Sequence, residues 1–214
     1  MKILGINLAE HGSICMLNDG QIELYLEAER ITREKYDFKV HKIFDMVSKP
    51  DAIALADCDY GIGRKGNEKP LYTSMAKAKI SRKYPDVPIH DFTNLHHLTH
   101  ASVGYYTSHF LEAVCVVVDG LGSNKEIESI YHISHNEFIR VQKRLYKPES
   151  QGFGRLFELT AIEHGWDHRE AGKVMGLSAY GKGNSHEIQT LWETRLKLLV
   201  DDAIKLTGCN NIVL

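Results

Sequence analysis

Residues 113–122 read Ala-Val-Cys-Val-Val-Val-Asp-Gly-Leu-Gly, and this stretch decides the fold class. Ala113–Asp119 predicts a fully apolar, buried strand that ends in the aspartate and a glycine-containing turn. Two further strands are predicted at Glu128–Ser134 and Phe138–Lys143, joined by a polar turn at 135–137. The order is therefore strand, glycine-containing turn, strand, polar turn, strand.

The N-terminal residues repeat this order. Lys2–Leu8 predicts an apolar strand, and Ser13–Leu17 follows it after a turn at 11–12. After a tight turn at 18–20, Gln21–Glu27 alternates apolar and polar residues, as a strand with one buried face does. Two such units, each followed by helices, predict a duplicated α/β domain. Two unrelated hairpins in one mixed protein would give a similar pattern, so that alternative stays open at this point.

The remaining segments predict helices, short strands and loops. Asn94 is a candidate cap for a helix that runs to about residue 108. Other helices are predicted at 29–50, Leu71–Lys83, Gly154–His164 and 185–205, short strands at 51–56, 87–92 and 211–214, and glycine-rich stretches at Gly61–Lys69 and Gly172–Gly183. Because the last apolar strand stops at Leu214, we expect the second half of the duplicated fold to be incomplete.

The composition places the chain among ordinary globular proteins. It has 214 residues, of which 43% are hydrophobic and 25% are charged, which excludes disordered, collagen-like and disulfide-rich classes. The net charge of −2 gives no basic excess for nucleic acid or an anionic membrane. No apolar run reaches the roughly 18 residues of a membrane span. The four cysteines form no Cys-x-x-Cys pair, so we expect buried thiols and a cytoplasmic protein.

Three of the 12 histidines lie within five residues, and two of them have the spacing of a metal site. His96 and His100 stand at i and i+4, on one face of the predicted helix, whereas His97 points about 100° away. Asp119 ends the buried strand, where α/β folds bind phosphate ligands. Two imidazoles and a carboxylate suit Fe(II), Mn or Zn with open coordination positions. Two surface histidines on a helix are the alternative.

Glycines and basic residues predict contacts with anions. Gly120 and Gly122 allow backbone N–H groups to approach phosphate oxygens. The stretch Lys173–Gly181 could cradle a phosphate or a ring in a short loop, or could be a turn between two helices. The charged run Glu27–Asp37 is either a solvated helix face or a basic surface toward an anionic ligand.

Five motifs occur in an order that is typical of one enzyme family. They are Ile3–Ile6 with the turn His11-Gly12-Ser13 and Asp19-Gly20, then Glu27–Asp37, His96–Ala101, Val118–Gly122 and Lys173–Gly181. With these motifs nearly the whole chain resembles the N-terminal part of the carbamoyltransferases of the nodulation and antibiotic O-carbamoylation type. That family is similar in fold to actin-like ATPases and to the tRNA threonylcarbamoyl-adenosine synthases.

The resemblance implies a duplicated actin-like (ribonuclease H-like) α/β fold, with one subdomain at 1–110 and a second, truncated one at 111–214. It implies that a divalent metal, Fe(II) or Mn, is held by His96, His100 and Asp119 and contacts nucleotide phosphates. The substrates would be ATP and carbamoyl phosphate, which form a carbamoyl-adenylate. This intermediate would donate its carbamoyl group to a small-molecule hydroxyl acceptor.

The same resemblance implies roles for further residues. His11 would be catalytic, and Arg33 and Lys35 would bind substrate. The nucleotide phosphates would be bound by Gly120, Gly122, Lys173, Gly176 and Gly181.

The chain also departs from the family pattern. Gly12 stands where the family has Asp, Ile31 replaces Phe, Tyr36 replaces His, and Ser178-Ala179 replaces Ala-Pro. We expect the chain to lack the next glycine-rich nucleotide loop, a further aspartate ligand and the C-terminal module that makes carbamoyl-adenylate. A missing C-terminal part or a partner chain would then be needed for turnover.

Two other functions remain open. One is threonylcarbamoyl transfer to tRNA, against which the near-neutral charge argues. The other is a non-catalytic remnant or subunit that binds metal or nucleotide and depends on a partner. An incomplete sheet also leaves an edge that a second copy could cover, so association into a homo-oligomer is expected.

Overall fold

The computed structural model describes residues 1–9, 11–58, 68–149, 152–181 and 183–214, with side chains between 68 and 73 left aside. It divides into two compact units, 1–96 and 97–214. The sequence placed this boundary after residue 110. The difference concerns one helix, α3 (His96–Ser108), at whose start the division falls.

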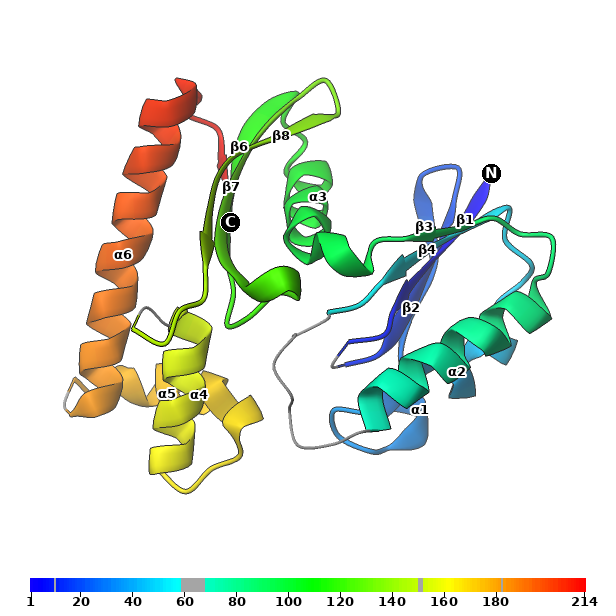
Figure 1. Ribbon diagram of the computed structural model, residues 1–214, viewed down its shortest axis with the longest axis horizontal. Helices are drawn as coiled ribbons and strands as arrows, with labels where there is room; N and C mark the ends of the chain where they lie inside the picture. Colours follow the sequence, from blue (N-terminus) through cyan, green and yellow to red (C-terminus); the bar gives the residue numbers. More distant parts are fainter. Residues whose placement is uncertain (10, 59–67, 150–151, 182) are drawn as a thin grey trace. The chain divides into compact units, whose positions relative to one another are not determined.

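A five-stranded sheet forms the first unit, in the order β3-β2-β1-β4-β5. Neighbours β1–β2 and β2–β3 are antiparallel, whereas β1–β4 and β4–β5 are parallel. Figure 1 shows these strands with α1 and α2 beside them. The bounds are β1 Lys2–Asn7, β2 Ser13–Asn18, β3 Gln21–Glu27, β4 Ala52–Ala56, β5 Ile89–Asp91, α1 Ala28–Thr32 and α2 Glu68–Lys83.

One face of this sheet carries the first core. Leu4 and Ile6 of β1 are buried, while Ile3, Gly5 and Asn7, which alternate with them, are half-buried, so the strand buries alternate positions. Ile80 of α2 and Phe44, from a short 3-10 helix at Phe44–Met46, belong to the same core cluster. The predicted alternation of apolar residues therefore corresponds to one covered face.

The second unit repeats the strand arrangement of the first. Its sheet has the order β8-β7-β6-β9, with antiparallel β6–β7 and β7–β8 and parallel β6–β9. These are the order and directions of β3-β2-β1-β4, which confirms a duplicated α/β fold over two unrelated hairpins. The bounds are β6 Glu112–Val118, β7 Glu126–Ser134, β8 Glu137–Leu145, β9 Ile212–Val213, α4 Phe153–Glu163, α5 Ala171–Ser178 and α6 Asn184–Thr207.

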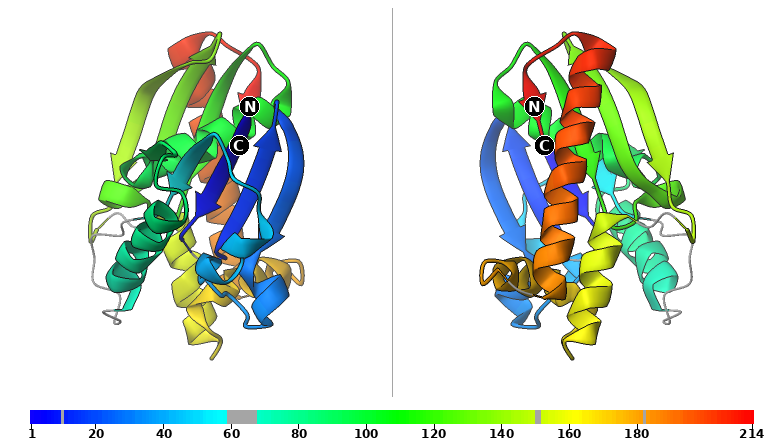
Figure 2. Two further views of the ribbon diagram at one scale, coloured as in Figure 1. Left: turned by 90° about the vertical axis from the view of Figure 1, so that its right-hand side faces the viewer. Right: turned by 90° about the vertical axis from the view of Figure 1, so that its left-hand side faces the viewer.

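Strand β6 is buried because helices cover both faces of the second sheet. Cys115 packs in a cluster with Tyr105 of α3, whereas Val116 packs on the other face with Leu199 of α6. The right-hand view of Figure 2 shows α6 lying along this sheet. A strand covered on both sides needs no polar positions, which explains its unbroken apolar sequence. Burial also raises the pKa of the Cys115 thiol to about 11.

Three expectations from the sequence are wrong. The helix predicted at 29–50 stops at Thr32, because Arg33 and Tyr36 adopt positive φ and the chain turns back. The stretch Lys173–Gly181, for which a short loop was predicted, is helical up to Ser178. Cys15 is half-buried, while the other three cysteines are buried. The loop predicted at Gly61–Lys69 lies largely outside the described residues.

Every helix of the described part of the chain is too short or too polar to traverse a lipid bilayer.

A buried carboxylate ties three elements of the second unit together. Glu128 of β7 has a side chain only 3% exposed and is paired with Arg144 of β8 and with Arg195 of α6. The Arg195 Nη2 to Glu128 Oε2 distance is 2.8 Å. Burial by itself would raise the pKa of Glu128, but the two guanidinium groups outweigh it and hold this pKa below its ordinary value.

We predict that Glu128→Gln lowers the free energy of unfolding by about 3–5 kcal/mol, because two partly buried guanidinium groups lose their counter-charge. Glu112→Gln is the matched control, since Glu112 pairs with His132 across a distance of 2.8 Å but is 52% exposed. The control should change stability by less than about 1 kcal/mol. Urea denaturation of both variants measures the difference, and equal losses would contradict the assignment.

The depressed pKa of Glu128 predicts a dependence of stability on pH. Its contribution is present above the ordinary carboxylate pKa and is lost as the pH falls through the lower, folded-state value. Below about pH 4.5 the wild-type protein should therefore lose stability more steeply than Glu128→Gln. Thermal melts between pH 3 and pH 6 measure both slopes, and parallel curves would refute this role.

Candidate metal centre

Two histidines project from the first turns of α3. His96 is its first residue and His100 lies one turn later. Asn94 does not cap this helix as predicted, because it belongs to a 3-10 helix at Thr93–Leu95 that leads directly into α3. The continuous helical backbone places the i and i+4 side chains on one face.

Asp119 follows the last residue of β6 and is held by the backbone around it. Its amide donates to the carbonyl of Ile127 across 2.9 Å, which continues the pairing with the neighbouring strand. Its Oδ1 atom accepts from the amide of Gly120 at 2.6 Å. These two bonds give the carboxylate a defined direction.

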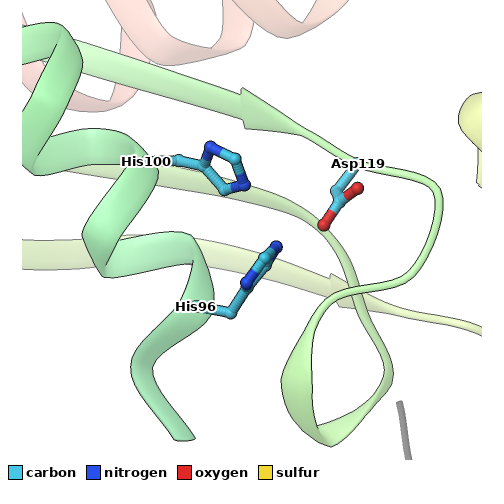
Figure 3. A group of neighbouring side chains, drawn as sticks. All are labelled: His96, His100 and Asp119. Carbon is cyan, nitrogen blue, oxygen red and sulfur yellow. The ribbon is translucent and has the colours of Figure 1, made fainter. Parts of the chain in front are cut away.

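The structure brings together the three residues that the sequence predicted as ligands. One ligand atom from each of His96, His100 and Asp119 lies within 4.8 Å of the others. In Figure 3 the two imidazoles, from α3, and the carboxylate, from the end of β6, point toward one another. His96 and Asp119 are half-buried and His100 is exposed, so a ligand can reach the group from solvent.

This donor set fits a divalent transition metal. Two imidazole nitrogens and one carboxylate oxygen are the ligands of catalytic-type sites that keep positions open for water or substrate. The arrangement can therefore hold a cation that would in turn bind phosphate oxygens.

In the turn after Asp119, the backbone N–H groups that the sequence predicted as phosphate donors already form hydrogen bonds within the turn. The amide of Gly122 donates to the carbonyl of Glu126 at 2.6 Å, and the amide of Gly120 is already bonded to Asp119. Both N–H groups are thus used inside the turn. A phosphate contact with Gly120 or Gly122 stays a prediction that the local hydrogen bonds do not favour.

Helix α4 packs backbone to backbone against this turn, a contact that the sequence analysis missed. A Cβ added at Gly154 would lie 2.5 Å from Gly120 Cα, and one at Gly152 would lie 2.8 Å from the Asp119 carbonyl oxygen. Only residues without a side chain allow this approach. The Gly-Phe-Gly sequence at 152–154 was the available signal.

The predicted phosphate residues near residue 176 lie in and after α5. Gly176 is the sixth residue of this eight-residue helix, so its N–H belongs to the helical hydrogen-bond ladder rather than to an open anion cradle. Lys173 Nζ lies 2.8 Å from Glu170 and 5.5 Å from the centre of the Trp166 ring. Gly181 follows the helix with φ of +71°. Their phosphate roles stay predictions.

The predicted catalytic residue His11 lies in the first unit beside two residues of the charged run. Its Nδ1 is 3.7 Å from Glu29 Oε2, and its ring meets the Tyr36 ring edge to face at 5.1 Å. The Tyr36 amide donates to Glu29 at 3.0 Å, and this bond is the main reason that the pKa of Glu29 is low. Sequence analysis did not single out Glu29 as the neighbour of His11.

The two predicted substrate residues occupy different positions in that segment. Arg33 directly follows α1 with φ of +62°, and Lys35 Nζ lies 4.6 Å from the centre of the Tyr36 ring. The backbone also explains the departure at Gly12, because an added Cβ would lie 2.6 Å from the Phe38 carbonyl oxygen. A side chain at residue 12 therefore has no room in this fold.

We predict that Gly154→Ala destabilises the protein by about 1–3 kcal/mol, because its methyl group would overlap the backbone of Gly120. The shift should also displace Asp119 and weaken metal binding. Gly176→Ala is the control, since its Cβ meets nothing within 4 Å and alanine favours the helix by up to about 1 kcal/mol. Thermal melts and metal titrations test both, and equal effects would contradict the packing argument.

Comparison with known proteins agrees on the fold. No protein-family model matches the chain. Among solved structures, a proposed N-acetylmannosamine kinase from Listeria monocytogenes has a TM-score of 0.55 at 12% identity, covering 99% of this chain and 82% of its own. A ROK hexokinase from Thermus thermophilus has a TM-score of 0.55 at 11% identity, with 99% and 80% covered.

A ROK family protein from Streptococcus pneumoniae, solved with sucrose, is similar with a TM-score of 0.51 at 16% identity, with 99% and 79% covered. Together with the repeated sheet order, these similarities show that the chain has the actin-like ATPase fold. The predicted fold class is thereby confirmed.

Proposed function

We propose that this chain is the N-terminal part of an O-carbamoyltransferase that uses a carbamoyl-adenylate made from carbamoyl phosphate and ATP. A divalent metal, Fe(II) or Mn, would be held by His96, His100 and Asp119, and there it would bind and polarise nucleotide phosphate oxygens.

The observation that carries this proposal is the convergence of the three ligand atoms within 4.8 Å. His96 and His100 belong to the motif His96–Ala101, and Asp119 belongs to the motif Val118–Gly122. Both motifs resemble those of the carbamoyltransferase family, and they lie on different elements. Their meeting is what a shared metal site requires. The order of the other motifs along the chain supports the same family.

In the proposed transfer one bond forms, one bond breaks and one proton moves. The oxygen of the acceptor hydroxyl forms a bond to the carbamoyl carbon, and the bond from that carbon to the AMP phosphate oxygen breaks. AMP leaves, and His11 would take the hydroxyl proton, with Glu29 orienting its ring from 3.7 Å. Arg33 and Lys35 would attract the anionic substrate.

The structural neighbours support nucleotide use in general. Two of those with TM-scores of 0.55 are described as kinases, one for N-acetylmannosamine and one for hexose. Kinases bind a nucleoside triphosphate and act largely by positioning its phosphates. An enzyme that consumes ATP is consistent with that chemistry, whereas the carbamoyl group and its acceptor come from the motif resemblance alone.

We predict that the purified chain binds about one Mn²⁺ per molecule and that His100→Ala weakens this binding at least about 10-fold, because one of three ligands is lost. The fold should survive, since His100 is exposed. His132→Ala is the control, because His132 pairs with Glu112 away from the cluster. Isothermal titration with MnCl₂ measures the affinity; equal affinities of wild type and His100→Ala would exclude this site.

The proposal also predicts the behaviour of the reaction. The chain alone, given ATP, carbamoyl phosphate and a small alcohol as the carbamoyl acceptor, should release no AMP above background, because it resembles only the N-terminal part of the family. Adding a separately purified carbamoyl-adenylate-forming protein to the same mixture should produce AMP in a Mn²⁺-dependent manner. Chromatographic detection of AMP tests both statements. Carbamoyl transfer by the chain alone would contradict the first, and metal binding without AMP release in the mixture would indicate a non-catalytic binding subunit.

A further inference from the structure

The third histidine of the cluster in α3 is the buried one. His97 is 0% exposed, whereas its neighbours His96 and His100 reach the surface of the candidate metal centre. The helical spacing predicted that His97 points away from the other two. In the structure its ring nevertheless lies close to the predicted carboxylate ligand, with Nε2 3.8 Å from Asp119 Oδ2.

The opposite edge of the ring meets polar groups of β7. His97 Nδ1 is 2.8 Å from Ser129 Oγ, a hydrogen-bond distance, and 3.9 Å from Glu126 Oε2. Ser129 is 1% exposed and Glu126 is itself paired with Arg140 of β8. The Nδ1 edge of the ring therefore contacts the sheet, and its Nε2 edge faces Asp119.

We propose that His97 is a positioning residue of the metal centre, which orients Asp119 from behind while binding no metal itself. The inference rests on the proposed metal site. This role requires the tautomer in which the hydroxyl of Ser129 donates to Nδ1 and the ring carries its proton on Nε2, the nitrogen that lies 3.8 Å from Asp119 Oδ2. A favourable electrostatic contact there holds the carboxylate in the direction that His96 and His100 require.

Burial explains why such a contact is effective. A fully buried imidazole ring is strongly disfavoured unless its nitrogens have polar partners, so its position is narrowly defined. Arg140 balances the charge of Glu126, which lies near the Nδ1 edge of the ring. Partners behind a ligating carboxylate restrict its rotation and typically change metal affinity by about 10- to 100-fold.

A purely structural core histidine is the competing explanation, and two substitutions separate them. His97→Asn places its amide near the position of Nδ1, where it can still bond to Ser129, but it has nothing at the position of Nε2. His97→Gln reaches the Nε2 position with an N–H group and gives up the contact with Ser129. A positioning role predicts that the asparagine variant is the weaker metal binder; a structural role predicts no such order.

The experiment titrates Mn²⁺ into the full chain and its variants, with the melting temperature of the metal-free proteins measured in parallel. We expect His97→Asn to bind Mn²⁺ about 10- to 100-fold more weakly than wild type and His97→Gln to lose less. The visible spectrum of the Co²⁺-loaded protein should shift in His97→Asn, because the coordination by Asp119 changes. His132→Ala again serves as the control.

Several results would overturn the inference. One is a Mn²⁺ affinity of His97→Asn equal to that of wild type, even with a lowered melting temperature, because that combination describes a structural residue. Another is an unchanged Co²⁺ spectrum. If neither histidine variant folds, Ser129→Ala replaces them, and an unchanged affinity there counts against the role. If the wild-type protein binds no Mn²⁺, the proposed metal site itself is refuted, and this result differs from a failure that concerns His97 alone.

Discussion

The burial of β6 on both faces is the constraint on which the second unit depends. Its side chains alternate between the cluster with α3 and the cluster with α6, so one strand fixes the position of two helices. Because α3 packs on this strand, the histidines at its start are held at a set distance from Asp119, where the strand ends. The convergence of these three side chains is thus a direct consequence of how the core is packed.

Polar groups inside the same unit complete this frame. Glu128 links β7, β8 and α6 through Arg144 and Arg195, and Glu126 links β7 to β8 through Arg140. Buried charges of this kind are costly unless each is balanced, so they favour one register of the strands over its alternatives. These ion pairs therefore fix the position of β7, and with it Ser129, within hydrogen-bond distance of the His97 ring.

Much of the fold could be predicted from the pattern of apolar residues. The predictions that were wrong have a physical cause. The two three-stranded units were predicted because period-2 alternation and uninterrupted apolar runs are local signals. The helix at 29–50 was not formed, because Arg33 and Tyr36 turn the chain back. Most of the loop expected at Lys173–Gly181 lies in α5, which ends at Ser178, and Gly176 within this helix has open space around it.

The sequence by itself determined the three consecutive strands that open each unit and the three residues of the candidate metal centre, because hydrophobic period and i, i+4 spacing are local properties. Only the tertiary structure decided that Gly154 packs against Gly120, that Glu29 lies beside His11, and that His97 faces Asp119 from the core. These contacts join residues far apart in the chain, and no local pattern encodes a distance between elements. They arise when the helices and the sheet close on one core.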